Sequence, residues 1–258
     1  MRNKQTYSRF IQNVLPWNEF PKGRMIQFLH HSVEQDITSF DTSDFQGRNY
    51  IGKVFGVALS ESGLSRDEIQ LISKYGAPET DADKLIETVD KALLDLETDY
   101  LDLLLLDYPH LTAEIGNAID RLKSQGKIME VGGLNLEESQ VREFKIPLGV
   151  NQVPSPFTVR DALANIPTVV SAAEEIDHFV WCGNENIASE GEARVLRELC
   201  DQYQISEDQL YLRWILQHPA HLHPIICSSE KEEITAAVTA REKQLDPADW
   251  QKIQLMHS

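Results

Sequence analysis

Cysteine and long apolar runs are both scarce in this chain, and each absence excludes a class of protein. Three cysteines occur among 258 residues, Cys182, Cys200 and Cys227, an odd number without Cys-x-x-Cys spacing. Neither a disulfide framework nor a cysteine-ligated zinc site is therefore expected. No segment approaches the roughly 20 consecutive apolar residues that a membrane helix needs, and the first ten residues lack the apolar core of a signal peptide. We expect a cytoplasmic protein with no membrane partner.

Basic residues are also in deficit. Lysine and arginine together number 24 against 41 aspartates and glutamates, and the formal net charge is −17. Binding along a phosphate backbone requires clustered cations that release counterions, and the sequence contains no such cluster. A nucleic-acid partner is therefore not expected. The simplest interpretation of the excess acid is a self-repelling surface that keeps the protein dissolved.

A GxGxxG dinucleotide fingerprint is missing after the early strands, which argues against a doubly wound open sheet. The sequence instead alternates short apolar segments with amphipathic ones, over a length that suits one domain of about 250 residues. We predict strands near residues 7–17, 37–40, 69–73, 100–107, 127–132, 148–153, 178–181 and 223–227. We predict helices near 22–35, 47–59, 85–96, 113–125, 137–144, 159–176, 190–203, 207–218, 231–241 and 247–257. The alternation predicts a single-domain (β/α)8 TIM barrel over residues 1–258, with the doubly wound sheet as the competing fold.

The most informative segment is 100–110, which reads YLDLLLLDYPH. Its apolar run, interrupted by Asp102, offers no polar face to water, as expected for a parallel strand covered on both sides. Pro109 cannot donate a ladder hydrogen bond, so the strand ends near Asp107. Two interpretations of Asp107 remain open: a functional carboxylate at the carboxyl end of a buried strand, or a cap on a solvent-facing loop.

Polar or amphipathic side chains stand at the predicted carboxyl ends of most strands. In a parallel barrel these ends face one mouth, so the side chains converge there. The residues concerned are Asp41, Lys74, Asp107, Asn135, Gln152, Trp181, Ser228 and Ser229. Barrel rims are polar in any case, so a structural role for these residues remains the alternative.

At these positions the chain resembles the aldo-keto reductases, a barrel family that transfers hydride from NADPH to a carbonyl. Short motifs carry the resemblance along nearly the whole length. DTS at 41–43 resembles the family's DTA, ISKYG at 72–76 its TKFG or SKCG, TDYLDL at 98–103 its TDYIDL, GKI at 126–128 its GKIR, GGLN at 132–135 its GVSN, NQV at 151–153 its NQVE, LRWIL at 212–216 its ALRWLL, and PII at 224–226 its PIPG. Their order and spacing imply the same fold and common descent.

The resemblance implies a catalytic set of Asp, Tyr, Lys and His. Asp41 and Lys74 match the first and third members, but the proton-donating Tyr falls on Gln46 and the His falls on Asp107. A Gln amide cannot release a proton at working pH, and general acid catalysis is commonly worth about 10²–10⁴ in rate. Carboxylates on both sides of Lys74 would favour its charged form. Protonated Asp107, or Tyr50 one helical turn past Gln46, are the remaining candidate acids.

The resemblance also implies an NAD(P)H cofactor. Asn135 and Gln152 stand where the family binds the nicotinamide carboxamide, and Trp181 stands where an aromatic ring stacks under the nicotinamide. The Ser of the family's GVSN is Leu134 here, which removes one carboxamide partner. The site residues implied for the cofactor are thus partly retained.

The segment 227–233, CSSEKEE, replaces the family's GSxKxER, which holds the adenosine 2′-phosphate. Ser228 and Ser229 remain as cofactor candidates, whereas Glu230 and Glu233 occupy the positions of the cations, with Lys231 displaced by one residue. Carboxylates repel a dianionic phosphate, so NADPH is disfavoured. NADH stays compatible, because a Glu carboxylate can accept a hydrogen bond from its ribose hydroxyl. The alternative is that both acids complement the dipole of a helix amino terminus.

Three functional hypotheses follow. The first is a family oxidoreductase, built on a carbonyl-reductase scaffold, whose action on a small-molecule carbonyl compound is weak or lost. The second is a non-catalytic barrel, or pseudoenzyme, that binds a ligand or a partner. The third is a different enzyme that uses Asp41, Lys74 and Asp107 as an acid/base set or a Schiff-base lysine. It requires Lys74 to titrate near neutrality, which the two acids oppose.

Overall fold

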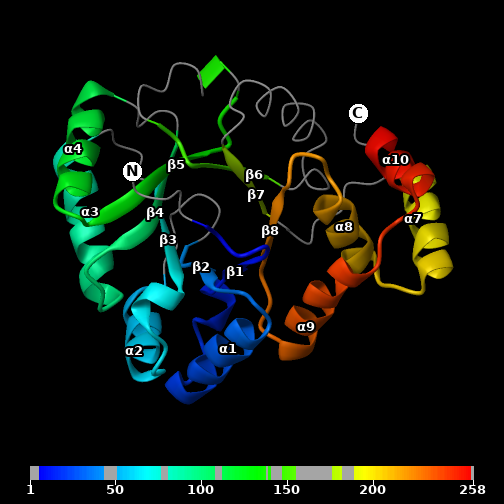
Figure 1. Ribbon diagram of the computed structural model, residues 1–258, viewed down its shortest axis with the longest axis horizontal. Coiled ribbons are helices and arrows are strands. Elements are labelled where there is room, and N and C mark those ends of the chain that lie inside the picture. Colours follow the sequence, from blue (N-terminus) through cyan, green and yellow to red (C-terminus); the bar gives the residue numbers. More distant parts are fainter. Residues whose placement is uncertain are drawn as a thin grey trace.

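Eight short strands close into a parallel barrel (Figure 1). The computed structural model describes residues 6–43, 51–76, 81–107, 112–137, 139–140, 147–154, 176–181 and 189–256. Each strand pairs in parallel with the next along the chain, and β8 pairs with β1. The strands are β1 (Ile11–Asn13), β2 (Ser39–Asp41), β3 (Gln70–Tyr75), β4 (Leu101–Asp107), β5 (Ile128–Leu134), β6 (Val150–Pro154), β7 (Asp177–Trp181) and β8 (His223–Ile226). The predicted (β/α)8 barrel is confirmed, and the doubly wound sheet is wrong.

Helices follow the strands and cover the outside of the barrel (Figure 1). Within the described residues they are α1 (Lys22–Glu34), α2 (Lys53–Glu61), α3 (Ala82–Asp95), α4 (Ala113–Ser124), α7 (Glu190–Tyr203), α8 (Glu207–Leu216), α9 (Lys231–Thr239) and α10 (Pro247–Met256), with 3-10 turns η1 (Leu15–Trp17), η2 (Arg66–Glu68) and η5 (Ala240–Glu242). The helix predicted at 137–144 lies mostly outside the described residues, as does the one at 159–176. The remaining helix predictions are confirmed apart from their ends.

Short-range signals place several helix ends where the sequence indicates them. The Ser206 hydroxyl accepts a hydrogen bond from the Gln209 amide, 3.2 Å away, and so caps α8. Asp246 accepts from the Ala248 amide at 2.9 Å, just before α10 begins at Pro247. Gly126 follows α4 with a φ of 73°, the left-handed conformation that glycine adopts most readily.

Strand β4 is buried on both faces, as its sequence predicts. Leu104 and Leu106 pack into the layer between barrel and helices, while Leu103 and Leu105 point into the barrel interior. The polar interruption, Asp102, is buried too, because its carboxylate accepts from the Leu71 amide at 2.8 Å and pairs with Arg66 at 2.6 Å. A charge inside an apolar strand is tolerated here because the Arg66 guanidinium and the Leu71 N–H replace part of the hydration that the carboxylate has lost.

The barrel interior is filled by side chains and has the character of a core rather than a channel. Members of this cluster come from most of the strands and from the segment before β1: Tyr7, Ile11, Ile72, Leu103, Leu105, Leu134, Val150, Phe179 and Ile225. Side chains alternate between the two faces of a strand. The residue two positions further toward the carboxyl end of a strand therefore points to the same interior side as the cluster member before it. Lys74, Asp107 and Gln152 are positioned in this way, and Asp41 lies on the face of β2 opposite Phe40, which packs in the outer layer.

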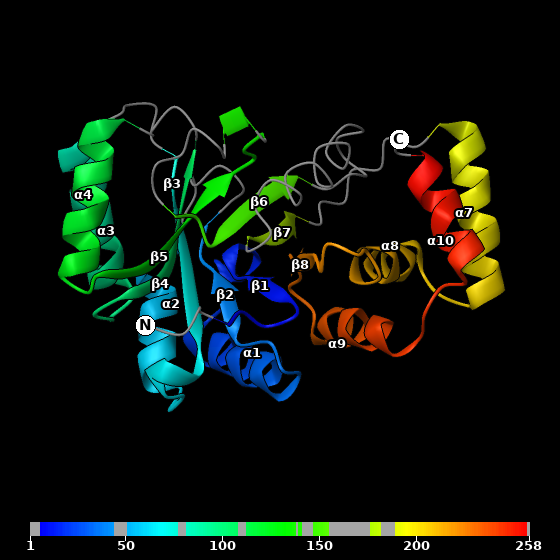
Figure 2. The same cartoon turned by 45° about the horizontal axis from the view of Figure 1, so that its top comes forward.

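A second apolar cluster lies outside the barrel, where α7, α8 and α10 meet at one end of the molecule (Figure 2). The indole rings of Trp214 and Trp250 stack with centroids 5.6 Å apart, and the Trp250 Nε1 donates to the Trp214 carbonyl at 2.9 Å. Stacked indoles bury a large apolar area while their N–H groups find partners. This cluster attaches the carboxyl-terminal helix to the barrel.

The first strand is shorter than predicted. One strand was expected over 7–17, but β1 ends at Asn13 and the chain turns into η1. The Asn13 side chain accepts from the Leu15 amide at 3.1 Å, and Pro16, which has no N–H, sits in the first turn of η1. The prediction of a continuous strand through Trp17 was therefore wrong, because local turn chemistry outweighed the apolar pattern.

Candidate active site at the barrel mouth

Asp41 and Lys74 meet at the carboxyl ends of β2 and β3. The Lys74 Nζ lies 2.6 Å from the Asp41 Oδ2, and 0% and 1% of these side chains, respectively, are exposed. The strands are held in register beside the pair by a hydrogen bond from the Thr42 amide to the Ile72 carbonyl at 3.0 Å. The structure therefore brings together two of the four predicted catalytic residues.

The environment of Asp41 acts on its charge in opposite directions. Burial raises the pKa of the Asp41 carboxyl, and the ammonium of Lys74 works against that rise. The Ser43 backbone N–H donates to Asp41 at 3.3 Å, and the Ser43 carbonyl accepts from the Nδ2 of the Asn13 side chain at 2.6 Å. Asn13 was not among the predicted site residues, although it stands at the carboxyl end of β1 as the others stand at theirs.

Asp107 ends β4 and is exposed. By alternation it shares the interior side with Leu105, which pairs with Lys74 in the neighbouring strand. Gln46 lies outside the described residues. The predicted placement of Lys74 between two carboxylates, and any role of Gln46, stay predictions.

Gln152 is fully buried on β6, and its side chain is unsatisfied. Neither its Oε1 nor its Nε2 has a hydrogen-bond partner among the residues that the structure describes. Leaving a buried amide unpaired costs about 1–3 kcal/mol, so such groups are usually retained for a ligand or another polar partner. A primary amide offers one acceptor and two donors, which is the complement of a nicotinamide carboxamide. The arrangement fits the cofactor that the sequence implies.

Asn135 follows β5 in a left-handed conformation, with a φ of 51°, and is exposed. Its amide donates to the Gln152 carbonyl at 2.6 Å, so the backbone ties the two predicted carboxamide-binding residues together. Asn151, which was not predicted, accepts from the Leu136 amide at 3.1 Å and donates to the Leu136 carbonyl at 3.0 Å. Trp181 ends β7, but its side chain is outside the described part of the structure.

The segment after β8 forms a polar turn at the start of α9. The Ser228 hydroxyl donates to Glu233 at 2.6 Å and accepts from the Glu230 amide at 2.9 Å. From α1, the Arg24 guanidinium donates to the Ser229 carbonyl at 3.2 Å and lies 3.6 Å from the Glu230 carboxylate. Arg24 was not predicted, because 205 residues separate it from Ser229 along the chain and only the closed barrel brings them together.

The described residues contain neither a metal-binding cluster nor a membrane-spanning helix. Within the described ranges no group of three His, Cys, Asp or Glu side chains is arranged to hold a metal ion. Across the same residues no helix combines the length and the apolar character that crossing a membrane requires.

Comparisons with known proteins agree with this geometry. The sequence profile described as "Aldo/keto reductase family" matches residues 12–162 and 183–257. The chain belongs to the aldo/keto reductase family. Its relatives in that family include the uncharacterized oxidoreductase YcsN of Bacillus subtilis, 26% identical over 96% of this chain and 93% of that protein. The methylglyoxal reductase YeaE of Escherichia coli is 29% identical over 74% of this chain and 69% of that protein.

The fold is shared with solved aldo/keto reductases as well. A Bombyx mori aldo-keto reductase in complex with NADP superimposes with a TM-score of 0.73 at 17% identity, covering 96% of this chain and 88% of that one. At this identity the likeness shows the barrel fold alone. Family membership, the barrel and the paired Asp41 and Lys74 are thus established, whereas the chemistry at the mouth has to be argued from the residues present.

Proposed function

We propose that this chain binds a nicotinamide nucleotide at the barrel mouth and reduces small carbonyl compounds slowly. The observation that carries the proposal is the buried pair of Asp41 and Lys74 on the same rim as the amide of Gln152, which has no partner among the described residues. One half of the family's site is thus retained. The other half, the Tyr and His positions, holds Gln46 and Asp107.

The retained residues position and polarise rather than transfer protons. The bound nucleotide supplies the hydride. Lys74, held by Asp41, places a positive charge beside the position where a carbonyl oxygen becomes negative. A Gln amide at position 46 can donate a hydrogen bond to that oxygen but cannot give it a proton. Without a general acid the proton must come from solvent water, so the rate falls by about 10²–10⁴ while the hydride transfer itself remains.

The test restores the missing groups. Gln46→Tyr combined with Asp107→His should raise kcat/KM for methylglyoxal, the substrate in the name of one relative, by roughly 10²–10⁴. Each single variant should gain less, and adding Lys74→Met to the double variant should remove the gain. A wild-type rate equal to that of the double variant would show that the substituted positions do not limit the reaction.

The turn after β8 favours NADH over NADPH. Glu230 and Glu233 place two carboxylates where the family places cations, and Arg24 is already engaged by the Ser229 carbonyl. A 2′-phosphate would meet net repulsion there, whereas an unmodified ribose hydroxyl can donate to a carboxylate. We therefore expect NADH to bind more tightly than NADPH.

This preference can be measured by quenching of tryptophan fluorescence during nucleotide titration. Glu230→Lys suits the experiment, because Glu230 is exposed whereas Glu233 accepts from Ser228. We expect the variant to gain roughly tenfold in NADPH affinity with little change for NADH. Glu232→Lys is the matched control, because it makes the same change of charge two residues further along the chain. Failure of wild-type protein to bind either nucleotide would refute the proposed function as a whole.

A second candidate is a non-catalytic barrel that keeps the mouth as a ligand site. It is favoured by the fact that both substituted positions belong to proton handling, while the described carboxamide-binding residues, Asn135 and Gln152, are retained. The two candidates differ in one measurement. Tight nucleotide binding with no turnover, persisting in the Gln46→Tyr/Asp107→His variant, would favour the binding protein.

A further inference from the structure

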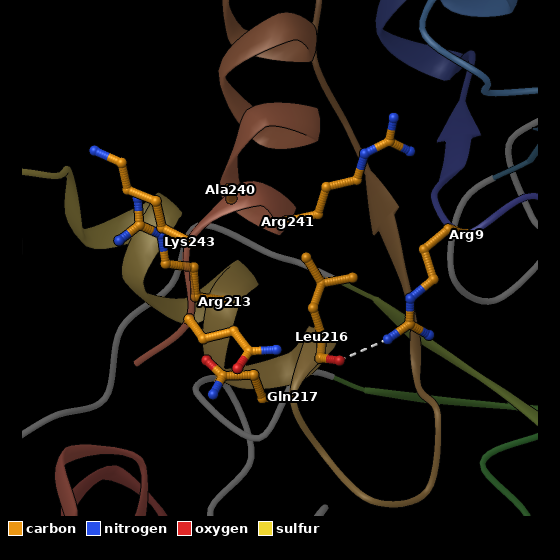
Figure 3. A pocket seen from close by; sticks show the side chains of 8 residues that line it. Arg9, Arg213, Leu216, Gln217, Ala240, Arg241 and Lys243 are labelled. Atoms are coloured by element: carbon orange, nitrogen blue, oxygen red, sulfur yellow. Dashed lines mark hydrogen bonds between the residues drawn. The ribbon is translucent and has the colours of Figure 1, made fainter. Parts of the chain in front are cut away.

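A cavity of about 250 Å³ with a cationic lining lies between the segment before β1, α8 and η5 (Figure 3). Four of its lining residues are basic: Arg9, Arg213, Arg241 and Lys243. They come from the segment before β1, from α8, and from η5 and the residue after it. Helices in this fold run against the strands, so the carboxyl ends of α8 and α9 lie at the amino ends of the strands, away from Asp41.

Arg213 is the decisive member of this group. The residue is only 4% exposed, and its Nε and Nη1 have no hydrogen-bond partner within the described part of the chain. Burial lowers the pKa of its guanidinium, but a guanidinium still stays charged in a protein. Arg213 follows Leu212 and precedes Trp214, both buried, so the helix cannot rotate to bring the charge into solvent. Two buried nitrogens of a charged guanidinium that lack a partner among the described residues point to an acceptor supplied by a ligand.

The other three cations reinforce Arg213. Arg9 donates to the carbonyls of Leu216 and Leu222 at 2.7 and 2.8 Å, which fixes its guanidinium at the cavity wall with other N–H groups to spare (Figure 3). Lys243 is exposed at the rim. Arg241 pairs with Asp36 at 3.2 Å, and both side chains are largely exposed. Asp36 therefore offsets little of the positive charge around the cavity. In a chain of net charge −17, four cations around one cavity are a marked local excess.

We propose that this cavity binds a phosphoryl group, either inorganic phosphate or a small phosphate monoester. A tetrahedral dianion accepts hydrogen bonds from several directions, and here the donors come from three separate elements. Planar guanidinium forks match two phosphoryl oxygens at once. Leu216 and Ala240 give the same cavity an apolar wall, which suits a small organic group attached to the phosphate. Bound there, the anion links the segment before β1 to α8 and η5.

Isothermal titration of the wild-type protein with inorganic phosphate tests the proposal, at a constant KCl concentration that screens non-specific attraction. We expect saturable binding at one site with a sub-millimolar dissociation constant, undiminished by saturating NADH because the mouth is at the other end. Glycerol phosphate in a parallel titration separates the two sources of the group: tighter binding than phosphate assigns the site to monoesters, and weaker binding assigns it to the free anion. No saturable binding of either would overturn the proposal.

Variants locate the binding. Arg213→Met should weaken phosphate binding roughly 10–100-fold, and Lys243→Met, an exposed change that leaves the core intact, roughly 2–5-fold. Arg194→Met on α7 removes the same charge from a side chain that is 74% exposed and should change nothing. Equal weakening in all three would mean that phosphate responds to net charge alone, and the proposal would fail. If Arg213→Met does not fold, the remaining two variants still test the proposal: Lys243→Met should weaken phosphate binding and Arg194→Met should not.

Discussion

Asp41 and Lys74 are held together in a place where neither charge could remain alone. Both side chains are buried, and their contact at 2.6 Å replaces the hydration that each has lost. Removing one partner of such a pair leaves an uncompensated charge, whereas replacing both with neutral groups of similar shape is much better tolerated. The pair is thus a constraint on folding as well as a candidate for chemistry.

This reasoning predicts the response to substitution. Lys74→Met should lower the free energy of unfolding by about 3–5 kcal/mol, because the Asp41 carboxylate is left buried and unpaired. Asp41→Asn in the same chain should restore most of that loss, because the amide carries no charge. Urea unfolding followed by circular dichroism measures both. Additive losses in the double variant would mean that the two side chains do not depend on each other.

The protein should lose stability in mild acid, because the imidazoles of His178 and His218 are buried. Burial lowers the pKa of both His178 and His218 to about 4; for His178 the nearby His218 and His223 add to the effect and Asp177 opposes it. Between pH 6.5 and 4 the unfolded chain therefore binds more protons than the folded one, so stability falls as the pH drops through that range. The free energy of unfolding should fall by about 1.4 kcal/mol per pH unit for each histidine in this range.

Urea unfolding at several pH values between 7 and 4.5 tests this expectation. Neither ring nitrogen of His178 has a hydrogen-bond partner in the described structure, so His178→Leu keeps the apolar packing and should remove about half of the slope. His221→Gln is the control, because His221 is exposed. An unchanged slope in the His178 variant would show that other groups cause the acid sensitivity.

At the residue scale the sequence predicts some of the site and misses the rest for a physical reason. Asp41, Lys74 and Gln152 are predictable because each lies at or near the carboxyl end of an apolar strand, and parallel strands bring such ends to one rim. Arg24 and Arg213 are not, because each lies within a helix whose pattern indicates only a solvent face or a core face. Their neighbours depend on barrel closure, which no local pattern encodes.

At the scale of elements, α2 and α3 approach each other through a glycine. A Cβ on Gly56 would lie 2.1 Å from the Asp95 carbonyl oxygen and 2.7 Å from the Leu96 backbone, so any side chain there displaces α3. Helix propensity favours alanine over glycine by up to ~1 kcal/mol, and the steric effect opposes it. The contact is with backbone rather than with a flexible side chain, so it cannot relax cheaply.

Gly56→Ala should therefore destabilise the protein by about 1–3 kcal/mol despite the better helix former. Gly191 on α7 is the matched control, because nothing lies within 4 Å of its Cβ position, and Gly191→Ala should stabilise by up to ~1 kcal/mol. Thermal unfolding of the two variants gives shifts of opposite sign if the packing argument holds. A gain in stability for both would show that α2 and α3 can separate without cost.

Element prediction succeeded where one signal dominated and failed where two competed. β4 was located from its apolar run, α7 from its periodicity, and α8 from periodicity together with the capping Ser206. The first strand was overextended because the aromatic and branched pattern continues through a turn that Asn13 and Pro16 create. The length of β1 is set by this turn and by its pairing with β8, and only the first of these is visible in the local sequence.

At the scale of the whole molecule, the closure of the barrel depends on few contacts. β1 is three residues long and pairs with β8 through Ile11 with Ile225 and Gln12 with Ile226. Arg9 supports this seam from outside the sheet by donating to the Leu216 and Leu222 carbonyls, which bracket the approach to β8. A closed barrel has no free strand edge, so opening the seam exposes the ladder of every neighbouring strand in turn.

Arg9→Met should therefore weaken the whole molecule rather than one corner of it. Two hydrogen bonds from a charged donor are lost and two carbonyls are left without it, so we expect a loss of about 2–3 kcal/mol in phosphate-free buffer. Unfolding should remain one transition, with tryptophan fluorescence and far-ultraviolet circular dichroism coinciding, because the seam joins the first strand to the last. Arg194→Met, exposed on α7, should stay within about 0.5 kcal/mol of wild type. Two separated transitions in the Arg9 variant would mean that the seam opens alone and that the barrel does not unfold as a unit.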